Sequence, residues 1–259
     1  MEDMTLGSST LEPTVWWAHT SAASDRLLSL LDEAERTRNT RFRLQADRDR
    51  HLIGRALTRL VLAEHAGCAP EDVLFDLRCR SCEDKARTGA GGQDASPHGK
   101  PIPVGAADGW EMSVSHSGEW VVLALAAGTP VGVDVERVSD SRDLDGLAAY
   151  TLADVERQEW DALPEFERVG AFFGYWARKE ALLKATGLGL SGGLRRVSVT
   201  PPHGRARLVD WEGGGRPESA WLGDLERGPD YRSALAVLTD RTVEPTVHQA
   251  EVTLELLRR

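Results

Sequence analysis

Two long helical patterns, each followed by a run of short strand-like segments, constrain the fold of this chain. Residues 46–66 place apolar side chains in helical steps and end before Gly67, a residue suited to a left-handed cap. Residues 164–186 repeat the pattern, with Pro164 in the first turn. Because a helix with one apolar side must bury that side against another element, the order predicts an α+β fold of two halves.

Shorter patterns complete each half. Residues 14–22 are rich in aromatic and β-branched side chains, as strands are, and residues 24–38 and 151–162 have helical periodicity. Thr151 and Asp154 have the spacing of a weak capping box for the latter helix. The remaining strand-like segments are KPIPV, EMSVSHSG, EWVVLALAAG, TPVGVDVERV, LRRVSVT, RARLVDW, SAWLGDL and RSALAVL.

The length of 259 residues fits two units of ordinary domain size, and the second unit repeats the order of elements in the first. We expect an N-terminal unit at 1–129 and a C-terminal unit at 130–259. Residues 80–99 lack apolar periodicity and are rich in Gly, Ser and Pro, which indicates a mobile insertion in the first unit.

Composition argues against several classes of protein. A net charge of −10 and a pI near 5.2 disfavour a general nucleic-acid binder, because affinity for phosphate backbones comes mainly from Lys and Arg. The longest apolar run, residues 120–127, is far shorter than a membrane-spanning helix. The acidic opening does not resemble a signal peptide, and Cys68, Cys79 and Cys82 form a sparse, odd set. We therefore expect a cytoplasmic protein that binds neither nucleic acid nor membrane.

The segment VGVDVERV at 131–138 alternates strictly between valines and other residues. On a strand this pattern places Asp134 and Glu136 on the face opposite the three valines. Two acids on one face occur on ordinary solvent-exposed strands, and they are also close enough to share one cation.

The second long helix carries Glu180 and Lys184 four residues apart, so their side chains lie one turn from each other. Spacing alone favours an ordinary ion pair on the helix surface. Together with Asp134 and Glu136, however, Glu180 would supply a third carboxylate for a hard cation such as Mg²⁺. A lysine beside such a cluster would suit negative charge that develops on a phosphate or a leaving group.

Basic and small residues suggest an anion site elsewhere in the chain. His116 follows Ser115 in a turn that ends a strand, and Gly118 lets the backbone approach a ligand, although the imidazole could simply bond to its own turn. Lys100 precedes Pro101, which stiffens its base. Basic residues that lie before or in the first turns of the first long helix form either a phosphate grip or a solvated face: Arg43, Arg48, Arg50 and His51.

Cys79 and Cys82 have the C-x-x-C spacing of half a zinc site, and His98 could provide a third ligand. The chain has no second cysteine pair, so zinc is the less favoured interpretation.

The order GKP, SVSHSG, VGVDVE and WARKEALLKATGLGL closely resembles that of the Sfp-like 4′-phosphopantetheinyl transferases, from about Arg38 to Leu190. These enzymes move the phosphopantetheine arm of coenzyme A onto a serine of apo carrier proteins of fatty acid, polyketide or nonribosomal peptide synthesis. The resemblance implies a monomer with two pseudo-twofold-related halves, each a small, mainly antiparallel sheet packed on a long helix, and coenzyme A bound between them.

The resemblance also implies roles for individual residues. Asp134, Glu136 and Glu180 take the Mg²⁺ positions, and Lys184 falls on the catalytic lysine that stabilises departing 3′,5′-ADP. Glu180, or a water on the metal, removes the proton of the serine. The positions that match coenzyme A contacts are Arg50, His51, Lys100, Ser115, His116 and Lys179, with Arg38 as a further candidate.

Carrier proteins are usually acidic, so an enzyme of net charge −10 needs an apolar or locally basic docking patch, which we expect near the helix of Glu180 and after Gly187.

Three alternatives stay open at this point. The chain could be another Mg²⁺-dependent phosphotransferase, a non-catalytic module that binds coenzyme A or carrier proteins, or a zinc-stabilised interaction protein.

Overall fold

A computed structural model describes residues 10–78, 99–140, 143–189 and 193–250 of the chain. Its α-helices are α1 (Glu33–Arg41), α2 (Gln45–Ala66), α4 (Leu144–Thr151), α5 (Asp154–Asp161) and α6 (Glu165–Thr186). Its strands are β1 (Thr14–His19), β2 (Leu74–Arg78), β3 (Lys100–Val104), β4 (Trp110–Ser117), β5 (Trp120–Ala127), β6 (Val131–Arg137), β7 (Val197–Val199), β8 (Leu208–Trp211), β9 (Trp221–Asp224), β10 (Tyr231–Val237) and β11 (Thr246–Gln249).

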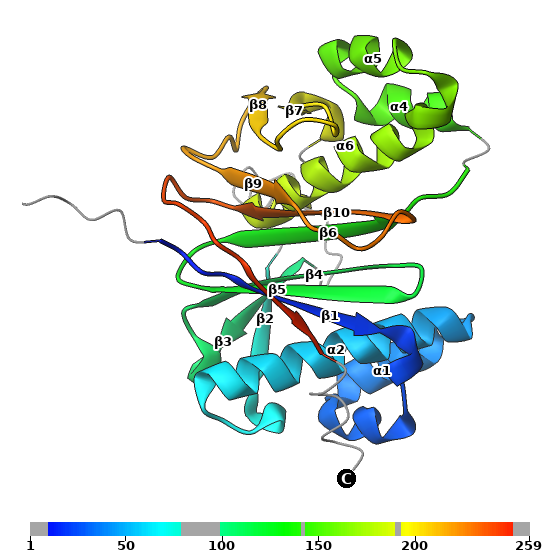
Figure 1. Cartoon of the computed structure of the whole chain (residues 1–259). Helices are drawn as coiled ribbons and strands as arrows, with labels where there is room; N and C mark the ends of the chain where they lie inside the picture. The colour runs from blue at the N-terminus through cyan, green and yellow to red at the C-terminus, as the bar shows by residue number, and fades with distance from the viewer. Residues whose placement is uncertain (1–9, 79–98, 141–142, 190–192, 251–259) are drawn as a thin grey trace, which may run out of the picture.

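The first half packs helix α2 against a sheet with the strand order β11-β1-β5-β4 (Figure 1). Strands β1, β5 and β4 pair antiparallel, whereas β11 pairs parallel with β1. Residues Ile53, Leu57 and Val61 of α2 are fully buried against this sheet. The chain therefore returns at 246–249 to complete the first sheet, across the expected division at residue 130.

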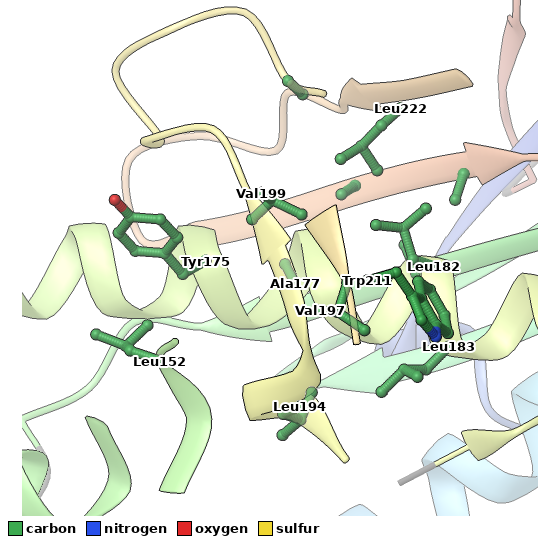
Figure 2. Close-up of a cluster of buried hydrophobic side chains, with 14 of the residues drawn as sticks. Leu152, Tyr175, Ala177, Leu182, Leu183, Leu194, Val197, Val199, Trp211 and Leu222 are labelled. Carbon is green, nitrogen blue, oxygen red and sulfur yellow. The ribbon is translucent and has the colours of Figure 1, made fainter. Parts of the chain in front are cut away.

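The second half packs helix α6 against an antiparallel sheet with the order β6-β10-β9. Small residues on β10, Ala234 and Ala236, lie in the core below α6 and permit close contact. Figure 2 shows Leu182 and Leu183 of α6 in the same cluster as Trp211. The predicted α+β class, with small, mainly antiparallel sheets and long helices, is confirmed.

A third core lies between the two sheets. Val131, Val133 and Val135 of β6 are fully buried there, together with Trp17 of β1 and Val122 of β5. The order of layers is α2, first sheet, second sheet and α6 (Figure 1). Because α6 covers the other face of β6, neither face of this strand is a solvent-exposed face. The interpretation of the alternating pattern as an ordinary surface strand is therefore wrong.

The long helices and the strands of the strand-like segments are confirmed, and Gly67 has the left-handed backbone expected of a cap (φ 66°). The helix expected at 24–38 is wrong as one element. Asp32 starts a new helix after a 3₁₀ segment, since Asp32 and Glu35 each accept the other's backbone N–H in a capping box.

The helix expected at 151–162 is also wrong at its start. Thr151 ends α4, and the cap of α5 comes from Glu156, whose carboxylate accepts the Ala153 N–H, so the proposed pair of Thr151 and Asp154 does not form. The expected insertion lies almost entirely outside the described residues, as do Cys79, Cys82 and His98. Among the described helices, none combines the length and the apolar character that crossing a membrane requires.

Candidate active site

Helix α6 crosses β6 at close range, and Gly132 makes this approach possible. A Cβ atom added at Gly132 would overlap the carbonyl oxygen of Ala181 and the backbone nitrogen of Ala185. Asp134 and Glu136 follow Gly132 on the same face of the strand because side chains repeat every two residues. The glycine of the VGVDVE segment thus sets the distance between the acids of β6 and helix α6.

Lys184 of α6 reaches across to these acids. Its Nζ atom lies 2.6 Å from Asp134 Oδ1 and also donates to Ser115 Oγ at 2.9 Å and to the Val133 carbonyl at 3.2 Å. Ser115 on β4 donates its own proton to Asp134 Oδ1 at 2.8 Å. Asp134 is 2% exposed, so its charge is held by a lysine from the helix and a serine from the first half.

Glu136 and Glu180 share the electrostatic environment of Asp134. Burial, followed by the charge of Asp134, raises the pKa of Glu136 to about 7 and that of Glu180 to about 7. Burial also raises the pKa of Asp134, against the opposing effect of Lys184. The structure therefore brings the three predicted carboxylates into one buried region, and Glu180 is only 8% exposed.

The chemistry of this region fits a hard divalent cation. Asp134 Oδ2 and Glu180 Oε1 are buried without a hydrogen-bond partner among the described residues. Buried acceptors that lack a donor carry a free-energy cost, which a cation bound by oxygen ligands would remove. The carboxylates are not a preformed cage, since no group of three or more His, Cys, Asp or Glu side chains within the described residues has metal-site geometry.

The raised pKa values predict how pH affects the metal-free protein. The pKa of Glu180 rises from 4.5 to about 7 on folding, so its contribution to stability is complete below about 4.5 and is lost as pH rises through about 7. The uncharged Glu180→Gln variant avoids this loss. In chelator, we expect it to be about 2 kcal/mol more stable than wild type at pH 8 and equally stable at pH 5, by urea unfolding.

A matched control for this experiment is Glu165→Gln, which changes an exposed carboxylate on the first turn of the same helix. It should unfold like wild type at both pH values. A wild-type protein as stable as Glu180→Gln at pH 8 would contradict the proposed environment of Glu180.

A cavity of about 520 Å³ opens beside Lys184, between the two halves. Of the predicted basic cluster, Arg50 and His51 line this cavity and Arg43 and Arg48 do not. Ser113, Val114 and His116 of the SVSHS segment also line it, whereas Ser115 faces Asp134. Its lining residues include Arg38, Arg50, His51, Gly54, Arg55, Thr58, Gly99, Lys100, Pro101, Met112, Ser113, Val114, His116, Lys184, Gly187, Leu188 and Gly189.

The two histidines of the cavity are neutral donors or acceptors in the ligand-free protein. Burial and then Arg55 lower the pKa of His51 to about 4, and burial and then Arg50 lower the pKa of His116. Arg50 itself donates to the Gly118 carbonyl at 2.6 Å, which ties helix α2 to the turn after β4. The positive charge available to an anion here comes from guanidinium and ammonium groups.

Comparison with known proteins identifies the family of this site. The family model of the 4′-phosphopantetheinyl transferase superfamily matches residues 130–236. A Synechocystis protein, provisionally named as a 4′-phosphopantetheinyl transferase, is 30% identical over 193 residues, which cover 72% of this chain and 69% of that protein. The chain belongs to the 4′-phosphopantetheinyl transferase superfamily.

Further similar proteins match over different shares of the chain. The 4′-phosphopantetheinyl transferase Sfp of Bacillus subtilis is 26% identical over 176 residues, 68% of this chain and 69% of Sfp. The crystal structure of holo-[acyl-carrier-protein] synthase from Thermotoga maritima is 26% identical, with a TM-score of 0.37 over 43% of this chain and 64% of that one. The predicted resemblance to Sfp-like transferases is confirmed.

Lys179 of this phosphopantetheinyl transferase superfamily member does not join the cavity. Its side chain is fully buried, forms an ion pair with Glu156, and donates to the carbonyls of Thr151 (2.7 Å) and Leu194 (3.2 Å). Lys179 and Lys184 are five residues apart, about 140° around a helix, so they point to different sides. The expectation that Lys179 contacts coenzyme A is corrected: it joins α6 to α4 and α5.

This position leads to a stability prediction. Lys179→Met leaves the Glu156 carboxylate unpaired in the core and should lower the free energy of unfolding by about 3 kcal/mol. The double variant Lys179→Met/Glu156→Gln should regain at least half of the loss, measured by urea unfolding. A raised KM for coenzyme A in the folded double variant would restore the earlier assignment of Lys179.

The sequence interpretation missed three residues that lie next to the predicted site residues in this structure. Arg55 lines the cavity and is held by Glu35, whose Oε1 lies 3.5 Å from its Nε. Ser113 and Ser117 flank Ser115 on β4 and also reach β6. The alternation in SVSHS could have indicated the two outer serines, since a period of two places all three serines on one face of the strand.

Proposed function

We propose that this protein transfers the phosphopantetheine group of coenzyme A to a serine hydroxyl of an apo carrier protein and releases 3′,5′-ADP. The main support is one arrangement: Lys184 bridges Asp134 and the wall of the cavity, with Glu180 one helical turn away. Membership of the transferase superfamily supports the same activity.

Asp134, Glu136 and Glu180 would hold the Mg²⁺ ion of this reaction. When bound, Mg²⁺ would neutralise the negative charge of the coenzyme A pyrophosphate. Asp134 Oδ2 and Glu180 Oε1 have no hydrogen-bond partner in the described part of the chain, which supports this assignment because each offers a lone pair to a cation. In the metal-free protein Lys184 partly compensates the charge of Asp134.

The reaction requires one proton to leave the serine and one P–O bond to break. The Glu180 carboxylate accepts the serine proton. The serine oxygen then forms a bond to the β-phosphorus, and the bond from that phosphorus to the bridging oxygen breaks. The electron pair goes to 3′,5′-ADP, whose new negative charge is stabilised by the Lys184 ammonium.

The cavity of about 520 Å³ is the proposed coenzyme A site. Arg38, Arg50 and Arg55 supply fixed positive charge for its phosphates, which suits guanidinium groups. His51 and His116 contribute hydrogen bonds, because both imidazoles are neutral at pH 7 before the anion arrives. Lys100 pairs with Glu111 and donates to the Val131 carbonyl, each at 3.2 Å, so it also fixes the wall of the cavity.

The carrier protein is expected to dock near α6 and the segment after Gly187. The exposed Arg195 and Arg196 follow this segment on a chain of net charge −10; Arg195 pairs with the exposed Asp154, and an acidic partner could compete for this arginine. We predict that Arg195→Ala/Arg196→Ala raises KM for an acidic carrier protein several-fold and leaves KM for coenzyme A unchanged, measured by initial rates. Equal changes in both constants would contradict docking here.

The protein is expected to act as a cytoplasmic monomer.

The direct test mixes the purified protein with apo carrier protein, coenzyme A and Mg²⁺. Intact-mass spectrometry should detect phosphopantetheine on the carrier serine, and chelation of the metal should abolish the product. Unmodified carrier from fatty acid, polyketide and nonribosomal peptide systems alike would overturn the proposed function.

A further inference from the structure

Strands β4 and β6 lie side by side at the seam between the two halves, but they belong to different sheets. Each is an edge strand of its own sheet, so the side of β6 that faces β4 would leave backbone groups without partners. Side chains satisfy these groups instead. Ser113 Oγ accepts the Val133 N–H and Ser117 Oγ accepts the Arg137 N–H, each at 3.0 Å.

The middle and last serines of this row also meet the acids. Ser115 donates to Asp134 Oδ1 at 2.8 Å, and Ser117 donates to Glu136 Oε2 at 3.1 Å. Residues two apart on β4 therefore supply one hydroxyl each to residues two apart on β6. Ser113 has no acid opposite it, because Gly132 occupies the preceding position on that face of β6.

The direction of the Ser117 hydroxyl follows from simple counting. A serine has one proton to donate and lone pairs to accept. Since the backbone N–H of Arg137 can only donate, it must use a lone pair of Ser117, and the single hydroxyl proton is left for the Glu136 carboxylate. The backbone contact thus fixes the position of the oxygen from which that proton is delivered.

We propose that Ser117 is a positioning residue that holds the Glu136 carboxylate for the divalent cation. This inference rests on the proposed function, since Glu136 is one of the proposed cation ligands. Glu136 sits near the end of β6, where its side chain is only partly buried and has a longer reach than that of Asp134. A carboxylate on such a side chain loses rotational entropy when it binds a metal, and a hydrogen bond made beforehand lowers that cost.

Ser113 offers a matched comparison. Both serines accept one N–H from β6 at 3.0 Å, but the bond of Ser113 is buried and that of Ser117 is exposed. Loss of Ser113 should therefore destabilise the seam at least as much as loss of Ser117. Of these two serines, only Ser117 touches a proposed cation ligand, so the loss of Ser117 but not that of Ser113 should change the affinity for a cation.

The experiment measures binding of Mn²⁺ alone by electron paramagnetic resonance, together with urea unfolding, for wild type and for Ser117→Ala, Ser117→Thr and Ser113→Ala. We expect Ser117→Ala to weaken Mn²⁺ binding about tenfold and Ser117→Thr, which keeps the hydroxyl, to stay within about threefold of wild type. Ser113→Ala should lose stability while its Mn²⁺ affinity stays within about twofold.

Two results would overturn the inference and leave the proposed function intact. One is wild-type Mn²⁺ affinity in Ser117→Ala, and the other is an equal loss of affinity in Ser113→Ala, which would mean that the serines only hold the seam. Failure of the wild-type protein to bind Mn²⁺ would overturn both this inference and the assignment of the three carboxylates.

Discussion

Lys184→Met and Glu180→Gln are each expected to lower kcat for phosphopantetheine transfer by about a hundredfold or more. Lys184 places an ammonium group 2.6 Å from Asp134 at the wall of the cavity, where the proposed mechanism develops charge on the leaving group. Glu180 lies one turn away on the same helix, where its carboxylate is placed to accept the serine proton. Removing either group takes away an interaction that strengthens as the P–O bond breaks, so KM for coenzyme A should change much less than kcat.

Glu180→Gln separates chemistry from folding. In chelator at pH 8 it should be more stable than wild type, so a loss of activity in this variant does not point to unfolding. Glu165→Gln, on the exposed first turn of the same helix, should keep the wild-type rate. Rates of transfer by intact-mass time courses give kcat and KM for each protein. A wild-type kcat in either Lys184→Met or Glu180→Gln would remove the corresponding residue from the mechanism.

Gly132→Ala should cause the largest loss of stability, about 3 kcal/mol or more, because the added methyl group has no space. Its Cβ would overlap backbone atoms of Ala181 and Ala185, and backbone cannot move aside as the end of a flexible side chain can. Helix α6 would have to move away from β6. The same movement would carry Glu180 and Lys184 away from Asp134, so any protein that folds should also lose activity.

Gly214→Ala is the matched control, since a Cβ at Gly214 meets no atom within 4 Å. We expect its free energy of unfolding to stay within about 0.5 kcal/mol of wild type. Urea unfolding measures both variants, and the yield of folded protein serves as a second measure for Gly132→Ala. Equal stability of the two variants would show that α6 does not depend on close contact with Gly132.

Local periodicity was enough to predict several parts of the site. The four-residue spacing of Glu180 and Lys184 puts both on one side of α6, and the alternation at 131–138 puts Asp134 and Glu136 on one face of β6. The five-residue spacing of Lys179 and Lys184 places them on different sides of α6. The resemblance to the family nevertheless led us to expect that both lysines contact the ligand. The same kind of reasoning failed at Thr151, because Thr151 is the last residue of α4 and the side chain of Glu156 caps the start of α5.

The sequence by itself determined which residues share a face within one helix or strand, because that follows from backbone geometry that every chain obeys. Only the tertiary structure decided which faces meet. It paired the serines of β4 with the acids of β6, brought β11 back to β1, and buried Lys179 on Glu156. Contacts of this kind join residues far apart in the chain, and burial of apolar surface on both sides of β6 selects them.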